Sequence, residues 1–567
     1  MNTSTSAIPR TYNMSAIDIA LIALVWCVSA LVVNPVGDFP LLDDWWFGRT
    51  VNHFIETGDY RPLGGELMTM ITNILWGSLF CLPAGFSYTA LRLSTLSLSL
   101  IGLIGVYVLV RDLQQPRWLA LLVTLTLGLN PIYYSLSNTF MTDVPFVAIA
   151  TWAAVFLARS LKSGSDLQML AGAALALAAT LSRQLGLCIP LAFAVTLLLR
   201  PGVTPRIAFR AVIPLILCVG AYLAFKHWLA VTGRTVAFGW PNDAVLQELK
   251  NAKELIGLLF VHAFEVLINL GLFLSPVLLF SVKDIIRSHG RRAIVPIAIG
   301  TLTIILCGAV TAYYGDAVLF PMREDNLLVK FGLGPVYSRD TMVLHLDNMT
   351  PLPAGFWLIV TAMGFVGSAS LIATFSAHLP NLIRKVLQRV PIRDTEAVGL
   401  LLVLCGILYL LFLLPFPGFF DRYVLLLIPF FAAGIIGITD AFAKIAPYKE
   451  NLLRLPAFAL VAAFGLFALA GTHDYLARNR ARWEAFRDLM QHDHISPADI
   501  DGGYEFNGLY TFDLNYKGDD SRSWWFVNRD TYQVGFGPVP GYRVIKESSF
   551  DRWLPPHVQK VVILRKK

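Results

Sequence analysis

The sequence predicts an all-α polytopic membrane bundle with a small C-terminal α/β domain outside the membrane. Of its 567 residues, 56% are hydrophobic and only 15% are charged, whereas soluble domains carry about 25% charged residues. The mean hydropathy is +0.61. The apolar residues are also gathered in long, nearly uncharged runs along the whole chain. A soluble fold cannot bury this much apolar surface, so lipid must be the solvent for most of it.

A helix that crosses a bilayer needs about 20 mostly apolar residues. The sequence contains thirteen such segments, which predicts thirteen transmembrane helices. Their ranges are 17–34, 88–110, 117–136, 144–161, 167–182, 184–200, 209–229, 255–281, 293–314, 354–377, 398–415, 423–440 and 455–472. The first segment is followed by Asn34 and Pro35 and not by a small-residue cleavage site. It is therefore predicted to be an anchor and not a removed signal peptide.

The positions of the basic residues predict how the chain is oriented in the membrane. With the N-terminus and Arg10 in the cytoplasm, the basic loops 111–117, 200–210 and 283–292 all face the cytoplasm, as the positive-inside rule requires. One more apolar stretch, 67–83, would invert every later loop if it crossed the membrane. It is therefore predicted to be a re-entrant or interfacial helix on the outer side. The same rule accounts for the net charge of +7, so nucleic acid is not predicted as a partner.

This topology divides the chain into two domains. Residues 1–472 form the transmembrane domain, with three sizeable outer loops at 35–87, 230–253 and 315–352. Residues 473–567 turn polar at once and contain a predicted helix followed by short strand-like runs. They are predicted to form the extracytoplasmic C-terminal domain.

Three acidic residues are expected on the outer face. Asp43 and Asp44 follow the first span by a few residues and precede Trp45 and Trp46. Asp143 stands at the outer start of another span. Carboxylates at membrane depth are costly and are candidates for function by default. The alternative is structural: acids cap helices and tryptophans form an interfacial belt. Composition leaves both open, but three acids on one face are more informative than one.

Three arginines are also predicted to reach the outer face. Arg61 precedes a proline, Arg183 lies between two short spans, and Arg422 is followed by Tyr423. A guanidinium at a helix end can bind a phosphate through two parallel hydrogen bonds. The alternative is that each side chain extends to the lipid headgroups. Asp421, next to Arg422, could simply pair with it.

No metal site is predicted. His262, His345 and Asp347 match no established ligand spacing. The six cysteines form no CxxC pair, and most lie inside apolar runs. They are therefore interpreted as small core residues.

The ordered motifs resemble the GT-C glycosyltransferases, in particular the branch of the protein O-mannosyltransferases and the lipid A aminoarabinose transferase. These motifs are the Asp43–Asp44 pair after the first span, Thr142-Asp143-x-Pro145 before the fourth, and Arg422-Tyr423 with Pro429 before a late span. Two departures occur: Asp44 stands where the branch commonly has Glu, and Arg61 stands in place of a Lys-Pro-Pro stretch.

The resemblance implies an inverting glycosyltransferase of the bacterial inner membrane, with the C-terminal domain in the periplasm. The donor would be an undecaprenyl-phosphate-linked sugar, and the acceptor hydroxyl would belong to a glycan, lipid or protein of the cell envelope. Asp43, Asp44 and Asp143 would be catalytic, with Asp43 the first choice of general base. Arg61, Arg183 and Arg422 would bind the donor phosphate, and Trp45, Trp46 and Tyr423 would line the substrate site. No cofactor is certain, although related branches use a divalent metal.

Other functions remain open at this stage. A transporter or flippase for a lipid-linked sugar is the main alternative. Transporters often show internal repeats and charges near broken helices at the membrane midplane, and neither is evident in the sequence. A polysaccharide polymerase or ligase would place its key residues in one large outer loop. A membrane scaffold is the remaining possibility.

Overall fold

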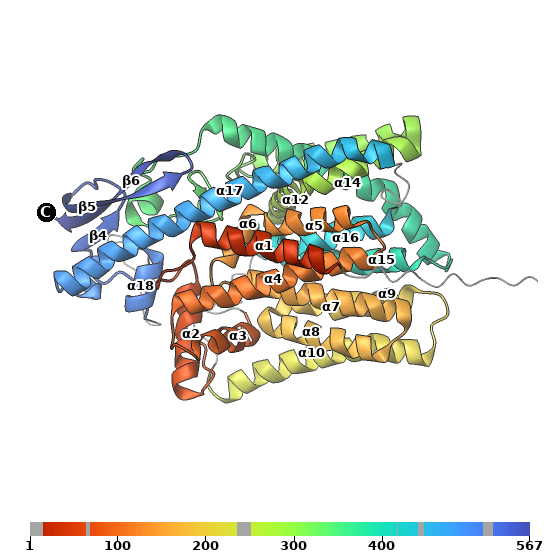
Figure 1. Ribbon diagram of the computed structural model, residues 1–567, viewed down its shortest axis with the longest axis horizontal. Helices are drawn as coiled ribbons and strands as arrows, with labels where there is room; N and C mark the ends of the chain where they lie inside the picture. Colours follow the sequence, from red (N-terminus) through yellow and green to blue (C-terminus); the bar gives the residue numbers. More distant parts are fainter. Residues whose placement is uncertain (1–14, 64–67, 235–250, 417, 440–446, 514–524) are drawn as a thin grey trace, which may run out of the picture.

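The structure is a computed structural model that describes residues 15–63, 68–234, 251–416, 418–439, 447–513 and 525–567. Most of the long helices lie roughly side by side, and a small sheet lies at one end of the bundle (Figure 1). The predicted fold class, a helical multi-pass membrane bundle with a small C-terminal sheet, is confirmed. We call the end of the bundle nearest the sheet the site end.

Each of the thirteen predicted spans corresponds to helical structure. The first half of the bundle contains α1 (Ala16–Val33), α4 (Tyr88–Asp112), α5 (Arg117–Gly128), α6 (Pro131–Ser137), α7 (Asp143–Ser163), α8 (Asp166–Ser182), α9 (Cys188–Leu199) and α10 (Pro205–Val231). The second half contains α12 (Ala252–His289), α13 (Ile294–Tyr313), α14 (Ala354–Leu387), α15 (Asp394–Leu413), α16 (Leu427–Ile438) and α17 (Pro447–Arg487).

The described helices differ in their capacity to cross a membrane. Nine helical segments are long and apolar enough, when α12 and α13 are taken as one segment. The pair α5 and α6 would be a tenth, and it bends by 65°. The helices α8 and α9 are shorter apolar helices. Two further helices lie at the site end: α2 (Asp44–Thr57) and α3 (Ile71–Cys81). With 11 residues, α3 is too short to cross a bilayer.

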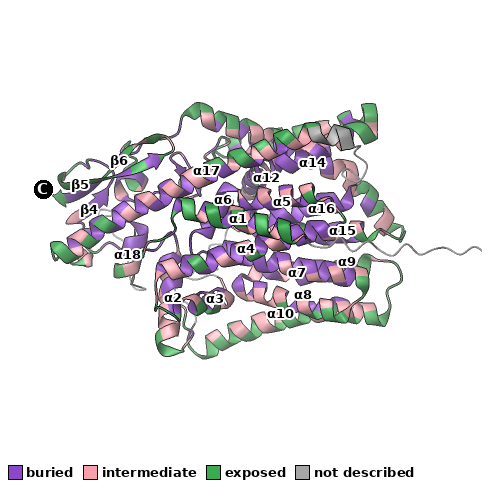
Figure 2. Cartoon of the chain, viewed as in Figure 1, coloured by how far each residue is buried: buried purple, intermediate pink, exposed green. Residues whose placement is uncertain are grey.

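The outer surface of the bundle is apolar, which is why the chain needs lipid around it. Many large hydrophobic side chains are exposed along α1, α10 and α13, for example Ile17, Ile216 and Leu302. Figure 2 shows exposed faces on α1, α10 and α17, whereas α4, α7 and α16 are largely buried. Exposing such a surface to water would cost a large free energy, whereas contact with the hydrocarbon of a bilayer does not.

The C-terminal region is built on the last long helix. The 41-residue α17 runs without a break from the bundle to Arg487 and passes straight through residue 473. After it come β3 (Ile500–Asp501), α18 (Tyr504–Thr511), β4 (Tyr532–Gly535), β5 (Tyr542–Trp553) and β6 (Pro556–Lys566). The sheet order is β3-β4-β6-β5, in which only β3 and β4 pair in parallel. The long strand β5 packs against α17 (Figure 1).

The loop between α13 and α14 is fastened to this region. It contains the short hairpin β1 (Leu328–Val329) and β2 (Gly332–Leu333). Arg478 on α17 donates hydrogen bonds to the carbonyl oxygens of Gly334 and Pro335, at 3.0 and 2.9 Å. Of the predicted outer loop 230–253, residues 235–250 lie outside the described part of the chain.

Candidate active site

Asp43 and Asp44 lie at the site end because α2 begins there. Asp43 is the N-cap residue of α2, and Asp44 is in its first turn, where the helix dipole favours negative charge. The link from α1 to α2 is held by Arg92 of α4. Its buried guanidinium donates to the carbonyl oxygens of Pro35, Gly37 and Phe39. This fixed link determines where the two acids stand.

Asp143 and Arg183 form a buried ion pair between two helix ends. Asp143 opens α7, and Arg183 is the C-cap residue of α8, in extended backbone conformation. The Arg183 guanidinium donates to Oδ1 of Asp143, and the two side chains are only 8% and 4% exposed. The turn after Arg183 requires Gly186, because a Cβ atom there would lie 2.5 Å from the backbone nitrogen of Thr180.

Arg422 joins this pair to Asp43. It lies in the short helix η4 (Asp421–Val424) before α16. One Nη atom is 3.4 Å from Oδ2 of Asp43, and Nε is 3.9 Å from Oδ2 of Asp143. We call Asp43, Asp143, Arg183 and Arg422 the acid–arginine cluster. Asp43 is its most accessible member, with a side chain 20% exposed against 9% for Arg422.

Aromatic rings flank the two arginines. The Arg183 and Arg422 guanidiniums lie 5.2 and 5.8 Å from the ring centre of Tyr423. Arg422 also lies 4.4 Å from the centre of the Phe420 ring. Such contacts favour the charged guanidinium by about 0.5–2 kcal/mol. Tyr423 therefore lies beside the cluster, where the sequence predicted a substrate-lining residue.

Asp421 does not act as a simple partner of Arg422. Its two carboxylate oxygens accept hydrogen bonds from the backbone N–H groups of Leu327 and Leu328, at 3.1 and 2.9 Å. Its own N–H donates to Oδ1 of Asn326 at 3.0 Å. Asp421 thus joins η4 to the β1 hairpin, and this contact fixes the backbone next to Arg422.

Asp44 is placed differently from its neighbour Asp43. It is fully buried, and its Oδ1 accepts a hydrogen bond from the backbone N–H of Phe140 at 3.0 Å. Burial raises the pKa of Asp44 to about 7, against the opposing effect of the Phe140 N–H. The side chain therefore ties α2 to the segment before α7. Unlike Asp43, Asp44 forms no ion pair with Arg422.

The remaining predicted site residues are Trp45, Trp46 and Arg61. Trp45 is fully buried and stacks on Trp46, with ring centres 4.9 Å apart. It also packs against Phe526 and Tyr504 of the C-terminal region, with ring centres 6.1 and 6.0 Å away. Trp46 is partly buried beside it. Arg61 is exposed and forms no ion pair with any residue that the structure describes.

Two tyrosines at the site were not identified from the sequence. Tyr504 of α18 donates a hydrogen bond to Oδ1 of Asp43 at 2.7 Å. Tyr337, in the loop between α13 and α14, packs against Tyr504 with ring centres 5.3 Å apart. Neither belongs to a recognisable motif. The sequence predicted only that Tyr504 belongs to the extracytoplasmic C-terminal domain and Tyr337 to the outer loop 315–352.

An apolar groove lies between α3, α4, α7 and α8. It has a volume of about 440 Å³. Its lining residues are Ile71, Thr72, Leu75, Trp76, Leu79, Leu98, Ile149, Ala174, Leu177, Ala178 and Leu181. They belong to α3, α4, α7 and α8. One of them, Leu181, precedes Arg183 by two residues in the chain.

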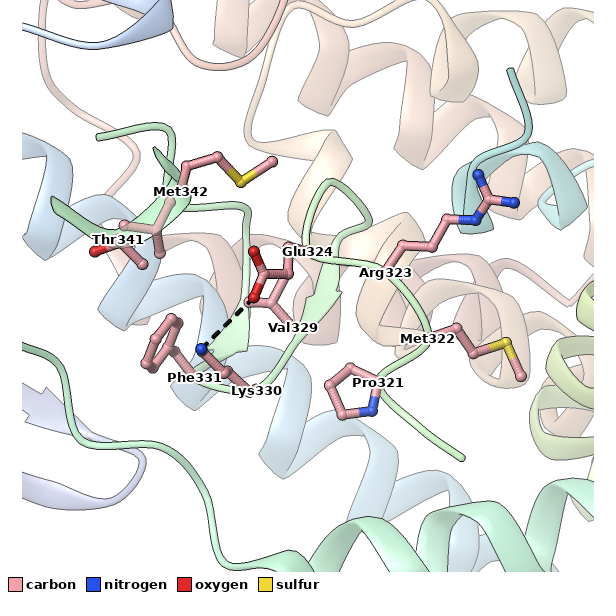
Figure 3. A pocket seen from close by; sticks show the side chains of 10 residues that line it. Pro321, Met322, Arg323, Glu324, Val329, Lys330, Phe331, Thr341 and Met342 are labelled. Carbon is pink, nitrogen blue, oxygen red and sulfur yellow. Dashed lines mark ion pairs between the residues drawn. The ribbon is translucent and has the colours of Figure 1, made fainter. Parts of the chain in front are cut away.

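A second, smaller cavity lies in the loop between α13 and α14. Its volume is about 130 Å³, and it is lined by residues of the 321–342 segment. Lys330 and Glu324 form an ion pair across it at 3.6 Å, as Figure 3 shows. The Arg323 side chain points away from that pair in the same view and binds Glu265 of α12 at 2.9 Å. No lining residue of this cavity belongs to the acid–arginine cluster.

The described residues contain no group of three or more His, Cys, Asp and Glu side chains that could hold a metal ion.

A sequence model of the dolichyl-phosphate-mannose-protein mannosyltransferase family matches residues 70–230. The match confirms the predicted resemblance to the GT-C glycosyltransferases over this stretch. It runs from the start of α3 into α10 and includes Asp143 and Arg183, whereas Asp43 and Arg422 lie outside it. No curated protein matches the chain.

Three solved structures are similar in architecture at low identity. ArnT from Cupriavidus metallidurans bound to undecaprenyl phosphate has 13% identity and a TM-score of 0.39, with 97% of each chain covered. The archaeal oligosaccharyltransferase AglB from Archaeoglobus fulgidus has 13% identity and a TM-score of 0.40, with 84% of this chain and 58% of AglB covered. The S. cerevisiae protein O-mannosyltransferase Pmt1–Pmt2 complex has 17% identity and a TM-score of 0.30. That last match covers 38% of this chain and 34% of the yeast chain.

Proposed function

We propose that this protein is an inverting glycosyltransferase that moves a sugar from a polyprenyl-phosphate carrier to an acceptor hydroxyl, with Asp43 as the general base. The observation that carries the proposal is the position of Arg422, 3.4 Å from Asp43 and 3.9 Å from Asp143. Two acids 100 residues apart in the chain thus meet one cation at the end of a membrane bundle. The matching family, whose name states a lipid-phosphate sugar donor, supports the same reaction class.

The geometry distinguishes Asp43 from Asp44. Asp43 is the more accessible of the two, with its side chain 20% exposed, whereas Asp44 is buried and held by the Phe140 N–H. A general base must reach the proton that it removes. Asp43 is therefore assigned as the base, and Asp44 is assigned to holding α2 in place.

The reaction would proceed in one displacement. The acceptor oxygen attacks the anomeric carbon while its proton passes to the Asp43 carboxylate. The bond between the anomeric carbon and the phosphate oxygen breaks, and its electron pair stays on the phosphate, so the anomeric configuration inverts. The phosphate gains one negative charge in this step. Arg183 and Arg422 are close enough to one another to stabilise that charge, because both contact Asp143.

The apolar groove supports a lipid-linked donor. It is lined mostly by apolar side chains of α3, α4, α7 and α8, and one of them, Leu181, precedes Arg183 by two residues in the chain. A prenyl chain lying in it would place its terminal phosphate at the arginines. A groove of about 440 Å³ would hold only the part of the carrier nearest the phosphate. The rest of the chain would extend into the lipid.

The proposed location is the bacterial inner membrane, with the site end on the outer side. The basic residues Arg159 and Lys162 lie near the end of α7 that is opposite Asp143. Arg287 lies in the last turn of α12, and Arg291 and Arg292 lie between α12 and α13. The hairpin after α13 lies at the site end. Basic loops favour the cytoplasm, which would leave the cluster facing outward.

A transfer assay tests the proposal. Purified protein would be mixed with radiolabelled sugars on undecaprenyl phosphate and with membrane extract, with and without EDTA. The wild type is expected to release label from the carrier, and Asp43→Asn is expected to lose this activity. Asp59→Asn is the matched control, because Asp59 follows α2 and pairs with Arg234 away from the cluster. If folded wild type consumes no donor, the glycosyltransferase assignment is wrong and a flux assay for a transporter follows.

A further inference from the structure

We propose that Tyr504 of the C-terminal region is a positioning residue of the catalytic centre, which orients the Asp43 carboxylate. This inference rests on the proposed function. The Tyr504 hydroxyl donates to Oδ1 of Asp43 at 2.7 Å, although 461 residues separate the two. Oδ2 of the same carboxylate faces Arg422 at 3.4 Å. Both oxygens are therefore held, and the plane of the carboxylate is set by two partners from different parts of the fold.

The ring of Tyr504 is locked between other aromatic rings. Its centre lies 4.8 Å from that of Trp525, 5.3 Å from that of Tyr337 and 6.0 Å from that of Trp45. Tyr504 itself is only 7% exposed. A side chain packed in this way has one rotamer available. Its hydroxyl can therefore hold a fixed direction toward Asp43.

The backbone before Tyr504 is equally constrained. Gly503 has φ of +81°, and a Cβ atom there would lie 1.8 Å from the carbonyl oxygen of Tyr337. Only glycine can occupy this position without moving the chain. The N–H of Tyr504 donates to that same carbonyl oxygen at 3.3 Å. The loop between α13 and α14 and the start of α18 are thus joined at the residue that contacts Asp43.

Side chains from α17 and α18 hold the same turn from the other side. Arg482 of α17 is buried and donates to the carbonyl oxygen of Gly502 at 2.9 Å. Asn507 of α18 accepts the N–H of Gly502 at 2.9 Å and donates to Asp501 at 3.1 Å. These hydrogen bonds join the turn to α17 and α18. Tyr504 is therefore placed by the scaffold and not by Asp43 alone.

The hydroxyl acts as a donor throughout the working pH range. Burial, with the nearby Asp43 carboxylate as a further cause, raises the pKa of Tyr504 well above its usual value. The other ionisable groups that face Asp43 are Asp44 beside it, Arg422 and Tyr337; Asp143 lies beyond Arg422. A donated hydrogen bond favours the charged carboxylate. Without such a hydrogen bond, a carboxyl group has a higher pKa and its side chain is less fixed in orientation.

The variant Tyr504→Phe tests this role, with Tyr510→Phe as the matched control. Tyr510 lies on the same helix and is 46% exposed. In the transfer assay, Tyr504→Phe is expected to lower kcat about tenfold, the equivalent of one ordinary hydrogen bond. The KM for the donor is expected to stay within about twofold, and the acidic limb of the pH–rate profile is expected to move to higher pH. Tyr510→Phe is expected to match the wild type.

A second substitution keeps the test decisive if Tyr504→Phe folds poorly. Replacement of Tyr504 by 3,5-difluorotyrosine keeps the ring in place and makes the phenol a stronger donor. The acidic limb is then expected to move to lower pH, opposite to the effect of the phenylalanine. An unmoved limb in a folded Tyr504 variant, or the same change in Tyr510→Phe, would overturn the positioning role. Wild type without transfer activity would instead overturn the proposed function, and this inference with it.

Discussion

Arg422 reaches Asp43 across 379 residues of chain, with an Nη atom 3.4 Å from Oδ2 of the carboxylate. Its Nε lies 3.9 Å from Asp143 on the other side. One planar guanidinium thus spans two carboxylates. A lysine ammonium is a single compact charge and cannot keep both contacts from the same position.

The first prediction concerns this geometry. Arg422→Lys is expected to lower kcat by about 10²–10³-fold, the usual cost of removing one fixed donor from a site where charge develops. The measurement is the rate of sugar release from the polyprenyl carrier. Arg529→Lys, in an exposed pair with Asp499, serves as the control and is expected to leave the rate unchanged. A lysine variant of Arg422 with the wild-type rate would remove Arg422 from the mechanism.

The second prediction concerns the pH dependence of stability. The pKa of Asp44 is about 7 in the folded protein because the group is buried, and it is about 3.9 in an unfolded chain. At a pH between these two pKa values, Asp44 keeps its proton in the folded state but has lost it in the unfolded state. The free energy of unfolding therefore falls as pH rises from about 4 to 7, by about 4 kcal/mol in total, and levels off above pH 7.

Asp44→Asn checks that pH dependence. Asparagine keeps an oxygen for the Phe140 N–H but cannot ionise. The free energy of unfolding of this variant should therefore not fall between about pH 4 and 7. The difference in Tm between this variant and the wild type is expected to widen from pH 5 to pH 7 and then stay constant. A constant difference across the whole range would show that Asp44 is ionised in the folded protein.

The third prediction concerns Asp421, which accepts two backbone N–H groups from the β1 hairpin. Asp421→Ala leaves both buried donors unpaired, at a cost of about 1–3 kcal/mol each. The Tm measured in detergent is expected to drop, and kcat is expected to fall because η4 no longer holds Arg422. Asp421→Asn, which keeps one acceptor oxygen, should lie between the alanine variant and the wild type. Equal stability of all three proteins would contradict this role.

The fourth prediction concerns the apolar groove. Ala174 lines it and is exposed to it, so Ala174→Phe should fill part of the space. The KM for an undecaprenyl donor is expected to rise about tenfold, which corresponds to about 1.4 kcal/mol of lost binding. The KM for a donor with a single short prenyl unit should change little. Leu167→Phe, on the same helix but outside the groove, is the control. An equal rise for both donors would place the lipid elsewhere.

The sequence was sufficient to predict most of the bundle, because each long apolar run can be satisfied only by a helix in lipid. It also predicted that Asp43 and Asp143 share a face, since the helix count and the basic loops fix which ends lie together. The proximity of Arg183 and Arg422 to those acids follows from the same reasoning. Their roles remain proposals until the variants are measured.

Other features of the site depend on packing that no local pattern reveals. Asp43 and Asp44 are adjacent in sequence, and only the phase of α2 decides which side chain is buried against Phe140. Asp421 binds the β1 hairpin because that loop folds back over η4. The contact between Tyr504 and Asp43 depends on how the C-terminal region docks. Periodicity and composition carry no information about such long-range contacts.

The unbroken course of α17 has a consequence for anyone who recombines this protein with a relative. A helix of 41 residues is about 60 Å long, and each residue turns it by about 100°. Inserting or deleting one residue within it would rotate everything that follows by that angle. Tyr504 would then leave the neighbourhood of Asp43 even though every contact inside the sheet survived. Chimaeras joined inside α17 must therefore preserve its length to the residue, because a joint that adds a single residue should misalign the active site.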